Sequence, residues 1–259
     1  MRAAAAGLNA IALTDHDTVA GLAEAAAALP PALDLIPGME LSCRRDGHSV
    51  HMLAYLFDPE HSGLAAQCEA IRLSRVERAK AIVAKLNELG VPVTWEQVTS
   101  IAGGGVIGRP HIARAMLAAG AIESTDQAFS PEWIGPGGRA HVRRYALDPA
   151  EAIALVHAAG GVVVLAHPFA MIRGWSVPEA LISELARTGL DGVEVAHPDH
   201  DASQREQLTA FARELGLAVT GGSDDHGELT GDRIGAEWTE QDDLDSLLDR
   251  ASGTRVITR

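Results

Sequence analysis

Short apolar runs alternate with longer stretches of helical periodicity along most of the chain. The runs are rich in valine, isoleucine and leucine, which is typical of strands that are buried on both faces. On this basis we predict strands at residues 9–14, 33–37, 50–57, 161–166, 192–196, 217–220 and 255–258.

Helical patterns separate these runs, and their ends carry the expected signals. The segments 149–159 and 178–188 begin with proline, and each is followed by glycine, as is the segment 202–215. Proline at a helix start and glycine after its end are typical of real helices. Repeated strand–helix units predict a parallel sheet, either open or closed into a barrel.

The middle of the chain breaks this alternation. Residues 63–89 and 110–119 have helical patterns, and glycine-rich segments at 103–105 and 135–138 indicate loops. We therefore predict a discontinuous barrel domain at residues 1–64 and 141–259, with an inserted helical cap at 65–140.

Charge also separates the middle segment from the rest. The chain of 259 residues has a formal net charge of −14, yet residues 66–144 carry 10 basic and 7 acidic side chains, a net +3. A basic insertion suits an anionic ligand, although a solvated helical face explains it too.

Composition excludes several classes of protein. The overall negative charge argues against a stable complex with nucleic acid, which needs a basic surface. Cys43 and Cys68 are too few for a disulfide framework or a four-thiolate zinc site. No apolar run is long enough for a membrane span, so we expect a cytoplasmic protein without membrane contacts.

Imidazoles and carboxylates follow, or lie within, several of the predicted strands. They occur at Asp15, His16, Asp17, Glu40, His48, His51, His167, Glu194, His197, His200, Asp224, Asp225 and His226. In α/β barrels, the loops at the carboxyl ends of the strands form the active site. Any single one of these residues could cap a helix or lie in a solvated turn. Together they indicate oxygen and nitrogen ligands for zinc, manganese or iron, and clustered metals can activate water against a phosphate.

Five ordered motifs carry a resemblance to a known family. They are ALTDHDT (12–18), IPGME (36–40), HSVHMLAY (48–55), VLAHP (164–168) and GGSDDHG (221–227). The chain resembles the PHP (polymerase and histidinol phosphatase) family of metal-dependent phosphoesterases. It most resembles the branch that hydrolyses nucleoside 3′,5′-bisphosphates and short RNA ends. The resemblance implies a distorted (β/α)7 TIM-like barrel with a helical cap.

The resemblance also implies which residues bind divalent cations. Two or three cations are expected, with manganese preferred and zinc or iron as alternatives. The implied ligands are His16, Glu40, His51, His167, Asp224 and His226. Glu40 would bridge two cations, and His51 is preferred to His48 because it directly precedes the MLAY run. Asp15 would orient a neighbouring ligand, and His167 or His226 could also assist proton transfer as catalytic residues.

Two motifs of the predicted cap resemble the branch's phosphate-binding segments. They are SRVERA (74–79) and GRPHIA (108–113). They imply that Arg75, Arg109 and His111 contact the phosphate of a small anionic nucleotide or a short RNA. Arginine offers a fixed fork of donors to phosphate oxygens. The alternative is that these side chains belong to ordinary solvated helix faces.

The chain departs from the family pattern at its start. Family members begin with a strand that ends DLHxHS, whereas this chain begins with MRAAAAG, so we expect a barrel that lacks its first strand. Either the start is placed too late, which we favour, or the protein is truncated and weakly active. A non-catalytic metal or nucleotide binder is therefore an alternative. A C–N hydrolase of the amidohydrolase type is disfavoured, because that class usually needs a metal-bridging modified lysine inside the barrel. The only lysines, Lys80 and Lys85, fall in the predicted cap.

Overall fold

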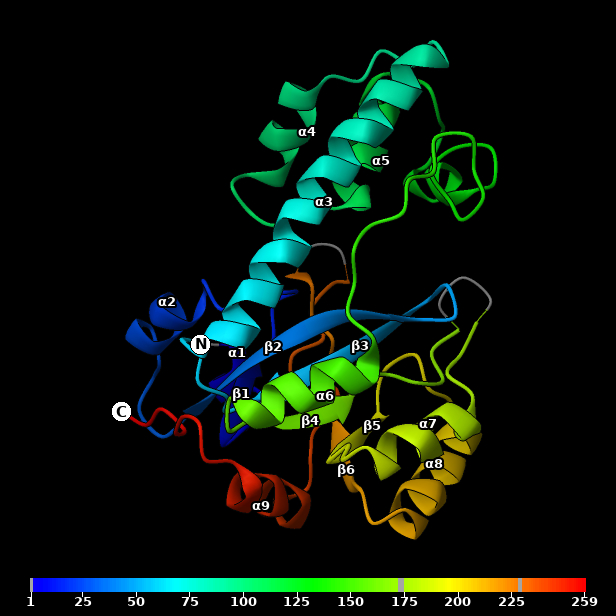
Figure 1. Ribbon diagram of the computed structural model, residues 1–259. Coiled ribbons are helices and arrows are strands. Elements are labelled where there is room, and N and C mark those ends of the chain that lie inside the picture. Colours follow the sequence, from blue (N-terminus) through cyan, green and yellow to red (C-terminus); the bar gives the residue numbers. More distant parts are fainter. Residues whose placement is uncertain (1, 172–174, 228–229) are drawn as a thin grey trace. The chain divides into compact units, whose positions relative to one another are not determined.

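A computed structural model describes residues 2–171, 175–227 and 230–259 of the chain (Figure 1). The chain divides into two compact units. The first contains the residues up to Ala66 together with Leu147–Arg259, and the second is Gln67–Ala146. Each unit is described by itself.

A six-stranded sheet forms the centre of the first unit. Its strands are β1 (Ala10–Leu13), β2 (Asp34–Arg45), β3 (His48–Tyr55), β4 (Val162–Leu165), β5 (Gly192–Ala196) and β6 (Ala218–Gly221), and they pair in that order. The sheet curls as it passes from β1 to β6 (Figure 1). The pairs β1–β2, β4–β5 and β5–β6 are parallel, but β3 is antiparallel to both of its neighbours. The prediction of a parallel sheet was therefore wrong for β3.

The long β2–β3 hairpin explains this difference. A strand was predicted only at 33–37, yet β2 continues to Arg45. Asp46 and Gly47 connect β2 to β3 with φ values of 50° and 85°. Positive φ at both central residues defines the two-residue turn that closes antiparallel strands, and Asp-Gly is a strong signal for it.

The predicted strand at 255–258 does not form. Ile257 makes only an isolated bridge with Leu35, through two backbone hydrogen bonds of 2.9 Å. The chain end is thus attached to β2 at one residue, which is too short a pairing to continue the sheet.

Within the described part of this unit, six helices accompany the sheet. They are α1 (Arg2–Ala5), α2 (Leu22–Ala27), α6 (Pro149–Ala158), α7 (Glu179–Arg187), α8 (Ala202–Glu214) and α9 (Gln241–Arg250). Asp148 and Asp201 cap α6 and α8, since each side chain accepts a backbone N–H of the first turn. Strand β4 is buried along its whole length. The Asp201 cap thus fixes where the loop after β5 ends.

The second unit is helical and has a core of its own. The helix α3 (Ser62–Glu88) begins in the first unit, and α4 (Trp95–Ala102), α5 (Arg109–Ala118) and the 3-10 helix η1 (Thr125–Phe129) follow. The core contains Ile82, Leu86, Val98, Ile112 and Met116, all with no exposed surface. The helices predicted at 63–89 and 110–119 agree with α3 and α5 to within one residue. Among the described residues, no helix is both long and apolar enough to cross a membrane.

Candidate metal centre

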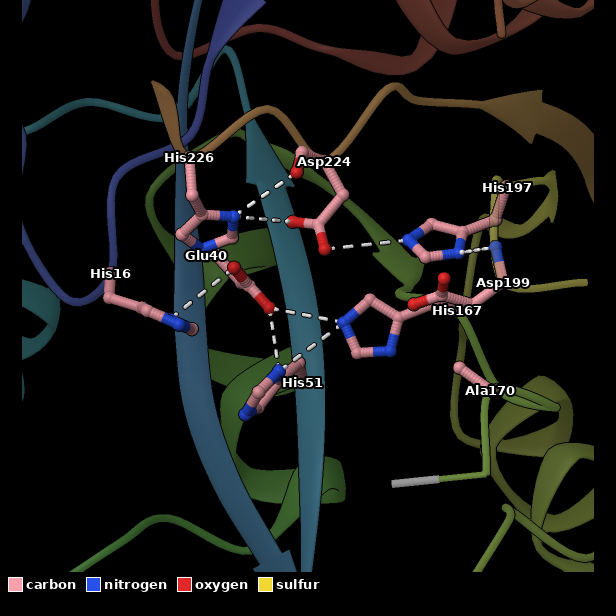
Figure 2. Close-up of a pocket in the computed structure, with 9 residues that line it drawn as sticks. All are labelled: His16, Glu40, His51, His167, Ala170, His197, Asp199, Asp224 and His226. Atoms are coloured by element: carbon pink, nitrogen blue, oxygen red, sulfur yellow. Dashed lines mark hydrogen bonds and ion pairs between the residues drawn. The ribbon is translucent and has the colours of Figure 1, made fainter. Parts of the chain in front are cut away.

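A pocket of the first unit is lined mainly by imidazoles and carboxylates (Figure 2). Its volume is about 170 Å³. It contains all six residues predicted as metal ligands, together with three others: His16, Glu40, His51, His167, Ala170, His197, Asp199, Asp224 and His226. These residues come from β2, from β3 and from the segments after β1, β4, β5 and β6, so folding alone brings them together.

Glu40 lies inside β2, and three imidazoles surround its carboxylate. Its Oε1 lies 2.7 Å from Nδ1 of His51 and 3.4 Å from Nε2 of His167, and its Oε2 lies 3.3 Å from Nδ1 of His16. The backbone N–H of Glu40 donates to Asp15, and its carbonyl accepts from Asp17. The loop after β1, which carries His16, is thereby attached to β2 beside Glu40.

The charges of this group shift its pKa values. Burial would raise the pKa of Glu40, but the neighbouring charges of His51 and His16 and hydrogen bonds from His167 and His51 lower it well below its ordinary value. Burial would lower the pKa of His167, but its hydrogen bond and ion pair with Glu40 raise it to about 9. The site thus favours an anionic Glu40 with positive charge beside it.

The donor set fits divalent cations. The donor atoms of His16, Glu40 and His51 all lie within 4.8 Å of one another. Nδ1 of His51 is also 3.4 Å from Nε2 of His167. Ligands about 2.0–2.1 Å from one cation lie about 3–3.5 Å apart. The separations of 3.3 Å between His16 and Glu40 and of 3.4 Å between His167 and both Glu40 and His51 suit atoms that share a cation. Among the described residues that line the pocket, every donor side chain is an imidazole or a carboxylate, which matches zinc, manganese or iron better than copper(I).

A second group of polar side chains lies around Asp224, in the loop after β6. Its Oδ1 is 3.4 Å from Nδ1 of His226, and its Oδ2 is 3.5 Å from Nε2 of His197. Burial would raise the pKa of Asp224, but His197 beside its Oδ2 and the charge of His226 lower it. The loop is held by Asp225, whose side chain accepts the backbone N–H groups of Gly227 and Arg233.

His167 follows β4 with a φ of 28°, in the left-handed region that is costly for a residue with a side chain. Its backbone N–H donates to Oε2 of Glu194, on the neighbouring strand β5, at 2.9 Å. Glu194 is buried, and that burial raises its pKa to about 7. The predicted ligand set did not contain Glu194. Its signal in the sequence is a carboxylate in the middle of the apolar run GVEVA.

For two pairs of neighbouring residues, the structure shows which member is the less exposed. His51 points into the pocket, whereas His48 is exposed and stacks on Trp175 with ring centroids 4.5 Å apart. Asp15, predicted to orient a ligand, has an exposed side chain. The buried carboxylate of that loop is Asp17, which accepts the backbone N–H of Ser42 at 2.7 Å. No such role was predicted for Asp17.

The three predicted phosphate-binding residues lie in the second unit. Arg75 is 9% exposed. Arg109 donates to the carbonyl of Ile134 at 3.3 Å and lies over the ring of Phe129. Nδ1 of His111 accepts the backbone N–H of Gly108, and burial lowers the pKa of its imidazole. Their role toward a substrate remains a prediction.

No family model matches the chain. It is 35% identical to a 5′-3′ exoribonuclease of Haemophilus influenzae, over 87% of this chain and 82% of the relative. It is 32% identical to a 3′,5′-nucleoside bisphosphate phosphatase of Chromobacterium violaceum, over 90% of this chain and 82% of the relative. A solved structure from Bifidobacterium adolescentis, assigned as a metal-dependent phosphoesterase, superimposes with a TM-score of 0.85 at 34% identity. That match covers 97% of this chain and 89% of the other.

Proposed function

Because the chain belongs to the PHP-type metal-dependent phosphoesterases, we propose that it hydrolyses phosphoesters of nucleotides. Phosphoester hydrolysis is the reaction class of this chain, and its α/β fold is that of a TIM-like phosphoesterase. The proposed substrates are nucleoside 3′,5′-bisphosphates or the 5′ ends of short RNA, in keeping with relatives named as a 3′,5′-nucleoside bisphosphate phosphatase and a 5′-3′ exoribonuclease.

The observation that carries the proposal is the arrangement around Glu40. A buried carboxylate that contacts three imidazoles provides a compact set of oxygen and nitrogen donors. Asp224 and His226 add a second acidic and imidazole pair in the same pocket. We propose that Glu40, His16, His51 and His167 hold one part of a cation cluster and that Asp224 and His226 hold another. Bound divalent cations would activate water and neutralise charge on the phosphate oxygens.

The pocket suits a phosphoryl group better than a whole nucleotide. Pockets that enclose a small organic ligand usually measure about 300–1,000 Å³, and this one measures about 170 Å³. The base and ribose would then remain outside it. Arg75, Arg109 and His111 are the proposed phosphate contacts of the second unit, on the strength of their motifs.

The test measures products from two substrates with the purified chain and manganese. We expect inorganic phosphate from adenosine 3′,5′-bisphosphate, or mononucleotides from a 5′-phosphorylated RNA of a few nucleotides. Either product should disappear with excess EDTA. If manganese, zinc and iron all fail to support release from both substrates, the proposed function is wrong.

A matched pair of variants tests the site itself. His51→Asn removes an imidazole that contacts Glu40 at 2.7 Å. His48→Asn removes an exposed imidazole three residues away in the same strand. We expect His51→Asn to reduce kcat/KM by about 100-fold or more, as for loss of a metal ligand or its support, and His48→Asn to retain activity. Equal losses would place the reaction elsewhere.

A further inference from the structure

The pocket contains one more imidazole, His197, that the motifs did not assign. We infer that His197 is a positioning residue, which orients the carboxylate of Asp224 by donating a hydrogen bond from Nε2, and that it is not itself a cation ligand. The inference rests on the proposed cation-binding role of Asp224 but not on the identity of the substrate.

The hydrogen bonds of His197 determine which ring nitrogen carries the hydrogen. Nδ1 accepts the backbone N–H of Asp199 at 3.1 Å. An accepting nitrogen has no hydrogen of its own, so in the neutral ring the hydrogen lies on Nε2. A cation ligand must instead offer a lone pair. Nε2 could bind a cation only if the hydrogen moved to Nδ1, where it would face the N–H of Asp199.

Nε2 points toward Asp224 (Figure 2). It lies 3.5 Å from Oδ2 of Asp224, and the side chain of His197 is 1% exposed. Within the described residues this nitrogen has no hydrogen-bond partner, and Oδ2 of Asp224 is the acceptor that faces it. A buried N–H without a good acceptor is costly, so the carboxylate of Asp224 is the group that can satisfy it.

Two hydrogen bonds to its carbonyl fix the backbone of His197. Its carbonyl accepts a hydrogen bond of 2.7 Å from Nη2 of Arg205 and one of 3.0 Å from the backbone N–H of His200. Arg205 is in turn paired with Glu237. The ring of His197 therefore has a fixed base from which to direct Nε2.

His200, three residues later, uses its two ring nitrogens differently. Its Nδ1 contacts the carbonyl of Val195 at 2.9 Å, and its Nε2 accepts the backbone N–H of Phe169 at 3.2 Å. Both nitrogens of His200 thus bind the backbone, and the ring connects the loops after β4 and β5. Of these two histidines, only His197 lines the pocket.

The consequence concerns the two oxygens of Asp224. Oδ2 faces His197, while Oδ1 lies 3.4 Å from Nδ1 of His226. Asp224 also has a φ of 45°, so its backbone alone is a strained support for a ligand. A donor on Oδ2 restricts rotation of the carboxylate and thereby fixes the direction in which Oδ1 is offered.

Two substitutions test the roles of the two ring nitrogens of His197 separately. In His197→Asn, the amide group can reproduce Nδ1 and accept the N–H of Asp199, but nothing replaces Nε2. In His197→Gln, the longer side chain can place an amide N–H where Nε2 lies. Titration calorimetry with manganese, without substrate, should show about 10–100-fold weaker binding for His197→Asn. We expect His197→Gln to bind with an affinity close to that of the unchanged chain.

A spectroscopic measurement on the unchanged chain remains decisive even if both variants fold poorly. Nitrogen-15 NMR of the imidazoles should show His197 with hydrogen on Nε2, both without cation and with a diamagnetic divalent cation such as zinc. A cation-induced move of the hydrogen to Nδ1, or unchanged manganese affinity in a folded His197→Asn, would overturn the inference. Cation binding without phosphoester hydrolysis would instead overturn only the proposed function.

Discussion

The two halves of the pocket are built in different ways. Glu40 and His51 lie within the paired strands β2 and β3, where cross-strand hydrogen bonds hold the backbone on both sides of each residue. His167 and Asp224 lie in loops after β4 and β6, and both have positive φ values. The first half takes its geometry from the sheet, whereas the second half needs additional support for a strained backbone.

That support comes from side chains on the neighbouring strand β5 and the loop after it. Glu194 accepts the backbone N–H of His167, and His197 faces the carboxylate of Asp224. One connected segment therefore supports both loop-borne residues. We call Glu40 and His51 the strand-borne half of the pocket, and His167 and Asp224 the loop-borne half. Cation binding by the strand-borne half should weaken when its own ligands are replaced. Cation binding by the loop-borne half should weaken also when Glu194 or His197, which bind no cation, is replaced.

The largest effect is expected from Glu40→Gln, which changes a proposed ligand of the strand-borne half. The substitution keeps the shape of the side chain but removes the charge that three imidazoles surround. Manganese affinity should fall by about 100-fold or more, and activity should fall with it. Titration calorimetry measures the first and phosphate or nucleotide release measures the second.

Glu24→Gln is the matched control for this variant. Glu24 is an exposed residue of α2, so the same chemical change there should alter neither quantity. A Glu40→Gln protein that binds manganese as well as the unchanged chain would remove Glu40 from the cation site.

A smaller effect is expected in the loop-borne half from Glu194→Ala. This substitution leaves the backbone N–H of His167 without its acceptor, although no predicted ligand is changed. We expect about 10–100-fold weaker manganese binding, measured by competition with a chelator. Glu194→Gln retains an oxygen that can accept the hydrogen bond, so it should bind manganese much more tightly than Glu194→Ala. If Ala and Gln variants bind equally, the contrast between the two halves is wrong.

The sequence predicts the regular parts of this fold well. The strand at 192–196 agrees with β5 at both ends, because its apolar residues are buried from Gly192 to Val195 and both neighbouring strands are parallel. The second half of β2 was missed because Pro37 and Gly38 usually interrupt strands. In the structure, a Cβ at Gly38 would lie only 2.9 Å from Thr14 and 3.0 Å from Tyr55, so glycine is what permits the close approach of the neighbouring chain segments.

The candidate site, too, could be predicted only in part. Motifs placed six residues, from His16 to His226, and all six line one pocket. The supporting contacts could not be predicted from spacing. Asp17 and Ser42 meet only because the loop after β1 is bound to the continuation of β2, which lies beyond the strand predicted at 33–37. His197 and Asp199 are close in sequence, but the nitrogen that accepts the hydrogen bond is fixed only by the folded loop.

The smallest effect is expected away from the pocket, at Asp243 on α9. Burial would raise the pKa of Asp243, but hydrogen bonds from Arg213 and from the backbone N–H of Val219 in β6 outweigh it and lower the pKa. A lowered pKa means that the ionised form stabilises the fold above the unfolded pKa of about 3.9, and that this stability is lost as the pH falls through the folded value.

Asp243→Asn should therefore lower the free energy of unfolding by about 1–2 kcal/mol at pH 7, and the difference should shrink below about pH 4. Urea unfolding at several pH values measures it, with the exposed neighbour Asp242→Asn as control. Manganese affinity at pH 7 should not change, because Asp243 supports β6 and not the loop that carries Asp224. A loss of affinity that follows the loss of stability would mean that the loop-borne half depends on the stability of the whole unit rather than on Glu194 and His197.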